Sequence, residues 1–313
     1  MKTSTSKRLR WNVAIWLAAG LFMTGASGMA AGPIMPDPKA EARHHPQIEE
    51  TANGIPLVNI TAPSSGGVSR NEYEMFNVPD KGAILNNSYT LSKTELAGYV
   101  PGNNNMAERP AKIIVNEVTG TGSTSMDGFL EVAGNRADVV IANPNGITVN
   151  GGGFINTGKA FLTTGKPVYD GEDHLQRFDI TGGDILIEGK GLGGKETESL
   201  AILSRAVKIN AGIWAKDLHI TTGANTVDAK TLEASAIEGK GGRPAFALDT
   251  AAIGGMYAGR ITLVGTEKGL GVNNSGTWSA EDNLILDWNG DLKNSGTIYS
   301  KGNTDLRASR LEN

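Results

Sequence analysis

The chain has 313 residues, of which 42 are glycine and none is cysteine, and its formal net charge is −4. The missing cysteine excludes a disulfide framework, a thiolate metal site and a cysteine nucleophile. The glycine content argues against a compact helical enzyme, because glycine weakens helix interiors. Collagen is excluded as well, since the glycines have no three-residue period and only 12 residues are proline.

Residues 1–31 have the pattern of a secretory signal peptide. A basic start precedes an apolar run over residues 13–26 and a small-residue cleavage site at residues 28–30. The run is short for a membrane anchor, which needs about 20 apolar residues. Without the four basic residues of this start, 25 of the 29 basic residues face 33 acids, and the mature chain has a net charge of −8. We therefore expect export through the Sec translocon and no nucleic-acid partner.

Residues 32–54 contain four prolines and scattered charges, which predicts a flexible lead-in. The remainder alternates short β-branched runs with turns of Gly, Asn, Asp or Pro. The runs are too closely spaced for intervening helices, which argues against a doubly wound α/β sheet. The predicted strands are residues 112–115, 139–142, 147–149, 184–188, 207–209, 218–221, 260–264 and 284–288.

The C-terminal part contains an internal repeat. Asn274-Ser275-Gly276-Thr277-Trp278 recurs 20 residues later as Asn294-Ser295-Gly296-Thr297-Ile298. A period of this length is typical of a solenoid, in which each coil stacks on the next. Trp278 and Ile298 would then lie in the interior, and the asparagines would form a ladder between coils. The alternative is a coincidental pair of hairpin turns.

The segment Asn143-Pro144-Asn145-Gly146-Ile147 predicts a tight turn between two strands. Proline presets φ at the second position, and Asn145 and Gly146 tolerate a left-handed backbone. Taken with its neighbours over residues 139–158, the segment resembles the secretion-domain signature of filamentous haemagglutinin-like proteins. These are the exported partners of two-partner secretion systems.

The resemblance continues, in the expected order, over most of residues 55–275. The other matching stretches are residues 62–71, 76–78, 82–88, 114–119, 205–215 and 248–265. The family also carries an upstream Asn-Pro-Asn-Leu motif, to which Asn103-Asn104-Asn105-Met106 corresponds here. Asn104 in place of proline leaves the turn less preset, and Met106 can still fill an apolar slot. We expect the fold to survive this change, and its effect on transport stays open.

The resemblance implies an all-β fold, a right-handed parallel β-helix with an N-terminal cap and extra-helical strands. It also implies export through the periplasm to the surface of a Gram-negative bacterium, with recognition by the POTRA domains of a cognate outer-membrane β-barrel transporter. The full-length protein would act in adhesion or toxin delivery at a host or neighbouring-cell surface. Residues 276–313 would be the start of haemagglutinin-type repeats, truncated at Asn313.

Two other functions compete with this interpretation. Residues 189–194 match the Gly-x-Gly-x-x-Gly pattern of dinucleotide sites, although 42 glycines make chance matches common. A secreted β-helix could also degrade polysaccharide, for which the acidic group of Asp170, Glu172 and Asp173 is the densest candidate. Because those acids lie in a Gly-flanked loop, a solvated loop is favoured. We predict a non-enzyme without cofactor or metal, and His44-His45 supports a metal site only weakly.

Overall fold

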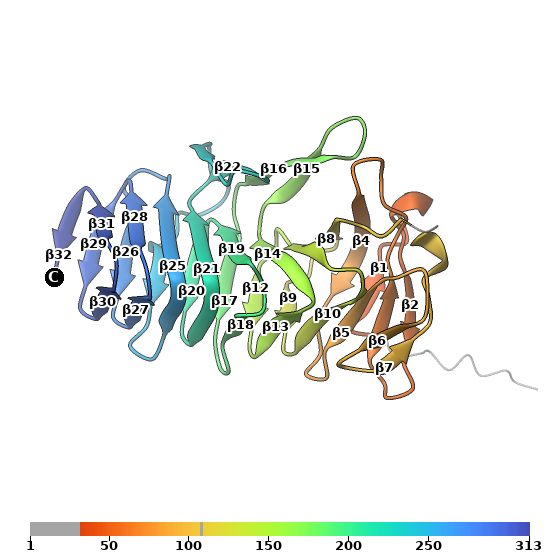
Figure 1. The fold of residues 1–313 in the computed structure, drawn as a ribbon. Coiled ribbons are helices and arrows are strands. Elements are labelled where there is room, and N and C mark those ends of the chain that lie inside the picture. The colour runs from red at the N-terminus through yellow and green to blue at the C-terminus, as the bar shows by residue number, and fades with distance from the viewer. Residues whose placement is uncertain (1–31, 107–108) are drawn as a thin grey trace, which may run out of the picture. The chain divides into compact units, whose positions relative to one another are not determined.

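The computed structural model describes residues 32–106 and 109–313. The signal peptide predicted over residues 1–31 lies outside this described part. Within it the chain forms short strands and two 3₁₀ turns, η1 (Ala42–His44) and η2 (Asn104–Met106). Figure 1 shows the strands stacked side by side, from the cap strands β1 (Ile34–Pro36) and β2 (Gln47–Glu50) to β32 (Arg310–Glu312).

Each coil after the first contributes one strand to each of three faces, and the strands within a face are parallel. The first coil reaches the third face only through an isolated bridge between Val78 and Met126. The first face consists of β3 (Pro56–Asn59), β5 (Ala83–Asn87), β10 (Phe129–Gly134), β13 (Gly152–Ile155), β18 (Leu192–Gly194), β27 (Thr277–Ala280) and β30 (Thr297–Ser300). The second face consists of β4 (Val68–Phe76), β8 (Ile113–Val118), β11 (Ala137–Ala142), β14 (Thr157–Thr163), β19 (Ser199–Ser204), β28 (Leu284–Trp288) and β31 (Thr304–Arg307). Two longer strands run through both faces, β21 (Gly212–Thr222) and β25 (Gly255–Gly265).

The third face closes each coil. Its strands are β9 (Thr124–Met126), β12 (Ile147–Val149), β17 (Asp184–Ile187), β20 (Ala206–Ile209), β24 (Phe246–Thr250), β26 (Gly271–Asn274), β29 (Asp291–Asn294) and β32 (Arg310–Glu312). Parallel pairing within every face makes the fold a parallel β-helix. Connections between parallel strands are right-handed by general rule, so the helix is right-handed. The fold class expected from the sequence is confirmed.

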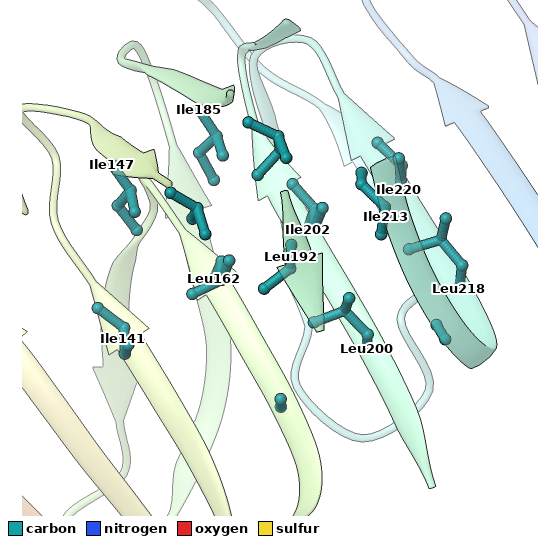
Figure 2. Close-up of a cluster of buried hydrophobic side chains, with 14 of the residues drawn as sticks. Ile141, Ile147, Leu162, Ile185, Leu192, Leu200, Ile202, Ile213, Leu218 and Ile220 are labelled. Carbon is teal, nitrogen blue, oxygen red and sulfur yellow. The ribbon is translucent and has the colours of Figure 1, made fainter. Parts of the chain in front are cut away.

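The interior is filled by one aliphatic layer per coil (Figure 2). On the second face Ile141, Leu162, Ile202 and Ile220 occupy successive register positions, and all four are fully buried. Inward residues of the other faces, such as Leu192, complete each layer. Burying each such side chain stabilises the fold by roughly 1.5–3 kcal/mol before entropy is counted. This regular stacking is what the alternation of short apolar runs and turns produces.

Four extra-helical strands form an antiparallel sheet outside the second face. They are β15 (Lys166–Tyr169), β16 (Leu175–Ile180), β22 (Asn225–Asp228) and β23 (Ala234–Ala236). Phe178 and Val227 of this sheet pack on the outward Val140 and Phe161, whose ring lies 5.9 Å from that of Phe178. A separate small hairpin, β6 (Ser92–Thr94) with β7 (Gly98–Val100), lies between β5 and β8 in the chain.

The prediction of a flexible lead-in over residues 32–54 was wrong. β1 (Ile34–Pro36) pairs antiparallel with β4, and β2 (Gln47–Glu50) pairs antiparallel with β3. The prolines misled the prediction because they are tolerated on edge strands and at register shifts, such as the one beside Pro36. The segment caps the first coils, and Ile34 and His44 are buried in it.

The C-terminal repeat stacks as predicted. Asn274 lies opposite Asn294 and Trp278 opposite Ile298 in neighbouring coils. The Asn274 amide donates to the Asn294 side-chain oxygen at 2.8 Å, and the Asn294 amide donates to Asn313 at 2.6 Å. Trp278 is fully buried and its indole N–H donates to the Thr250 hydroxyl. The asparagine ladder therefore joins successive coils along one turn.

Candidate functional site

The turn at Asn143 joins β11 to β12 at a corner of its coil. The buried Asn143 side chain accepts the Asn145 backbone N–H at 2.9 Å, and its backbone carbonyl accepts the Gly146 N–H at 3.1 Å. Its amide donates to the Gly122 carbonyl and the Thr124 hydroxyl, at 2.9 and 3.0 Å. Gly146 has a φ of 111°, which a residue with a side chain rarely adopts. The turn is thus closed on itself and tied to the preceding coil.

The variant motif at Asn103 forms an equivalent turn. Asn103 accepts the Asn105 backbone N–H at 3.0 Å, and its carbonyl accepts the Met106 N–H at 3.1 Å. Its amide donates to the carbonyls of Ile60 and Asn86, both at 2.9 Å. The Asn103 side chain is 2% exposed, as buried in practice as that of Asn143.

The two turns share the second asparagine as well as the first. Asn105 donates its amide to the Ile60 carbonyl at 3.1 Å, as Asn145 does to the Gly122 carbonyl at 3.3 Å. In each turn the same carbonyl therefore accepts from both asparagines. Met106 is 1% exposed and lies in the main core, so it fills the apolar position that the sequence predicted for it. The upstream turn closes without proline because the asparagine side chains hold it.

A groove of about 720 Å³ runs along the third face beside Asn145 and Gly146. The segment over residues 240–246 forms one wall of this groove. Arg205 connects that segment to the coil by hydrogen bonds. Arg205 makes two 3.0 Å bonds to the Glu267 carboxylate and donates to the Lys240 carbonyl at 2.7 Å. The hydrogen bonds from Arg205 lower the pKa of Glu267, so this pair stays ionised over a wide pH range.

A buried charge network links the cap to the extra-helical sheet. The sequence did not predict it. Arg70 lies 2.8 Å from Glu72 and 3.2 Å from Glu117, and its guanidinium lies 4.5 Å from the centre of the Tyr169 ring. His44 of the cap lies 3.1 Å from Glu72. Burial raises the pKa of Glu117 and lowers that of His44. The alternate spacing of Arg70 and Glu72 in a strand was the available signal, since it places both on one face.

The acidic candidates serve the tip of the β15–β16 hairpin. Asp170 accepts the backbone N–H groups of Glu172 and His174, both at 2.9 Å, and these bonds lower its pKa. Asp173 forms a 2.9 Å ion pair with Arg43 of the cap. This is the solvated, structural loop that the sequence favoured over a catalytic group. Across residues 32–106 and 109–313, no three His, Cys, Asp or Glu side chains are grouped so that they could hold a metal ion.

The glycine-rich stretch over residues 189–194 lacks the context of a dinucleotide site. Its end forms β18, and the segment that a nucleotide site would require as a helix continues into strand β19. Gly191 has a φ of 80° and faces the Gly212 carbonyl, where a Cβ would come within 2.1 Å. These glycines therefore serve close packing between coils. In the described part of the chain, no helix has the length and apolar character to span a membrane.

Comparison with known proteins identifies the family. The family model of the TPS secretion domain matches residues 33–298. This chain belongs to that family. The match starts earlier and ends later than the expected residues 55–275, and it includes the cap strands β1 and β2.

Relatives and a solved structure agree with this assignment. The chain is 43% identical over 298 residues to "Toxin CdiA" of Yersinia pestis and 43% identical over 284 residues to "16S rRNA endonuclease CdiA" of Enterobacter cloacae. These alignments cover 88% and 90% of the chain, but only 9% and 8% of those longer relatives. The crystal structure of the filamentous hemagglutinin secretion domain superposes with a TM-score of 0.76 at 32% identity, covering 90% of this chain and 97% of that one.

The predicted resemblance is therefore confirmed, and the chain is a secretion domain of exoproteins related to CdiA and filamentous haemagglutinin. Proteins of this family are secreted to the cell surface of Gram-negative bacteria, and a TPS domain implies a cognate outer-membrane transporter. Family membership supports a non-catalytic role for this segment.

Proposed function

We propose that this segment targets its exoprotein to the POTRA domains of the cognate transporter after Sec-dependent export into the periplasm. The match of the secretion-domain family over residues 33–298 carries this proposal. The basic and apolar start over residues 1–31 supports the first step, because it has the composition of a signal peptide. The chain reaches the transporter unfolded, passes through the outer membrane and folds at the cell surface.

Folding outside the cell makes passage through the outer membrane one-way. Each strand of the helix pairs only with the strands of adjacent coils, so coils can add one at a time as the chain emerges. Every added coil buries a further aliphatic layer and makes backward movement more costly. This direction of transport needs no ATP at the outer membrane.

The two asparagine turns act in this folding step. All polar atoms of the Asn143 side chain are used inside the protein, and the side chain is fully buried. A partner that meets the folded domain therefore cannot read Asn143 directly. We assign Asn143–Ile147 and Asn103–Met106 the role of closing corners as successive coils form.

The delivered activity lies with the whole exoprotein. The relatives named as toxin and endonuclease are much longer than the part that this chain matches. We propose that the exoprotein acts in toxin delivery or adhesion at a neighbouring or host cell surface. Polysaccharide degradation is not favoured, because the acids Asp170 and Asp173 are engaged in the turn and ion pair of a hairpin tip.

A binding experiment tests recognition separately from folding. Isolated POTRA domains are immobilised, and the chain lacking residues 1–31 is applied either freshly diluted from urea or already refolded. We expect the unfolded chain to be retained and the refolded chain to pass through. A matrix that fails to retain the unfolded wild-type chain would refute the proposed recognition.

Variants then separate the two roles of the turn. The pair Asn143→Ala and Asn145→Ala is compared with Asn303→Ala, which changes an exposed asparagine in the last coil. The proposed folding role predicts that the unfolded double variant binds POTRA like wild type but refolds more slowly. If the unfolded double variant does not bind, the POTRA domains recognise the motif in the unfolded chain and the proposed folding role is wrong.

A further inference from the structure

One file of outward residues crosses seven strands of the first face at the same register position. The pairing of β10, β13, β18, β21, β25, β27 and β30 defines it without a break. The file consists of Phe129, Gly153, Gly193, Trp214, Tyr257, Ser279 and Tyr299. Six steps of about 4.8 Å give it a length of about 29 Å.

Three aromatic rings of the file, those of Phe129, Trp214 and Tyr257, lie over glycine backbone, and Trp214 is half-buried. A Cβ on Gly212 would fall 2.5 Å from the Trp214 ring, and one on Gly255 would fall 2.8 Å from the Tyr257 hydroxyl. The rings of Trp214 and Tyr257 are 6.2 Å apart and nearly parallel, at 16°. Phe129, Tyr257 and Tyr299 are 42%, 39% and 50% exposed. The Phe129, Trp214 and Tyr257 rings thus cover glycine backbone on one side, and the exposed ring surface of the file is available to a ligand.

A hollow of about 300 Å³ interrupts the file between Phe129 and Trp214. Gly193 lines it, and Lys195 and Glu196 bring polar groups to it. Directly after β30 and β27, Lys301 forms an ion pair with Glu281. Each of these two places therefore carries one positive and one negative side chain, which suits an uncharged ligand with hydroxyl groups.

We propose that this aromatic file binds a neutral, linear polysaccharide. The C–H faces of successive sugar rings stack on the exposed aromatic faces, and sugar hydroxyls bond to Lys195 and Glu196 at the hollow. Nucleobases could also stack on such rings, but a strand of nucleic acid needs a continuous basic track along its phosphates. A row one residue wide is also narrow for a stable protein interface, which buries about 800 Å² per partner.

Covering glycine does not by itself explain the arrangement. Trp214 covers Gly212 and Tyr257 covers Gly255 within the same strand, and Trp214 also lies against Gly191 of the preceding coil. Phe129 likewise covers Gly153, the next position of the file. Tyr299 continues the file two coils beyond Tyr257, and it is not among the nearest neighbours of any glycine in the described residues. A linear ligand does require the alignment. The proposal is independent of the transport role.

Intrinsic fluorescence and calorimetry test the proposal on the folded chain lacking residues 1–31. Trp278 and Trp288 are 0% and 4% exposed, so ligand-dependent changes in emission report on Trp214. Cellohexaose is the probe, and heparin and a dT20 oligonucleotide are the anionic comparisons. We expect saturable quenching by cellohexaose in the millimolar range or below, with weaker effects of both polyanions.

Variants locate the site. Calorimetry should show about tenfold weaker cellohexaose binding for Trp214→Ala and for Tyr257→Ala. Trp214→Phe keeps a ring over Gly212 and should bind within a few-fold of wild type, which separates ring stacking from loss of folding. Tyr99→Ala removes an aromatic that is 69% exposed on β7, outside the file, and should change nothing. The proposal is overturned if cellohexaose gives no signal up to about 10 mM, if a polyanion binds more tightly, or if folded Tyr257→Ala binds like wild type.

Discussion

Replacing Asn143 by alanine should destabilise the domain strongly, although the side chain is polar and small. The change removes four hydrogen bonds: two donated to Gly122 and Thr124, and two accepted from the backbone and side chain of Asn145. Each is worth about 1 kcal/mol net, and buried groups left without partners add to the cost. We therefore expect a loss of at least about 4 kcal/mol in the free energy of unfolding.

Urea unfolding followed by circular dichroism measures this loss. Asn303→Ala should lie within about 0.5 kcal/mol of wild type, because that asparagine is exposed in the last coil. Asn103→Ala should cost nearly as much as Asn143→Ala, since the Asn103 side chain is equally buried and makes equivalent bonds. A loss below about 0.5 kcal/mol for Asn143→Ala would refute the account of both turns.

Three further predictions follow from local geometry. Asn104→Pro restores proline at the position equivalent to Pro144 and should raise the free energy of unfolding by about 0.4–1 kcal/mol in urea titrations. Asn105→Pro should lower the free energy of unfolding, because it deletes the backbone N–H that donates to Asn103. Gly276→Ala should lower the free energy of unfolding by more than about 2 kcal/mol in the same assay, because its Cβ would lie 2.2 Å from the Gly254 carbonyl oxygen. In the control Gly122→Ala, the added Cβ meets nothing within 4 Å. Equal losses for the two variants would contradict the role of Gly276 in close packing. Burial lowers the pKa of His219 from 6.5 to about 4. The stability that neutral His219 contributes is therefore complete above pH 6.5 and is lost as the pH falls towards 4. His219→Gln, but not the exposed His45→Gln, should therefore reduce the loss of stability between pH 7 and 4 by about 2–3 kcal/mol, and an unchanged pH dependence would contradict this.

Much of the solenoid could be predicted because its signals are local. The turns at Asn143 and Asn274 are read from neighbouring residues, and the 20-residue repeat places Trp278 opposite Ile298. The strands around Ile141 and Ile147 follow from apolar runs bounded by turn residues. These features need no knowledge of which distant segments meet.

The features that were missed depend on pairing across coils of unequal length. The aromatic file joins Trp214 to Gly193 and Tyr257, and no fixed period relates these positions in the sequence. The network around Arg70 joins the cap to the hairpin through Tyr169, across three separate elements. The cap contains several prolines, which occur in loops and also on edge strands. The sequence alone therefore predicts a flexible segment where the structure has two edge strands. The glycine surplus, by contrast, is explained where coils touch, as at Gly276 against Gly254.

Dependence of export on the transporter would show whether this domain works in two-partner secretion. The complete chain is produced in a Gram-negative host with and without its cognate outer-membrane transporter, and the protein outside the cell is measured by protease accessibility on intact cells. We expect folded, surface-accessible chain only when the transporter is present, with reduced yield for Asn143→Ala and normal yield for Asn303→Ala. Equal export of the wild-type chain without the transporter would contradict the assignment of this domain to two-partner secretion.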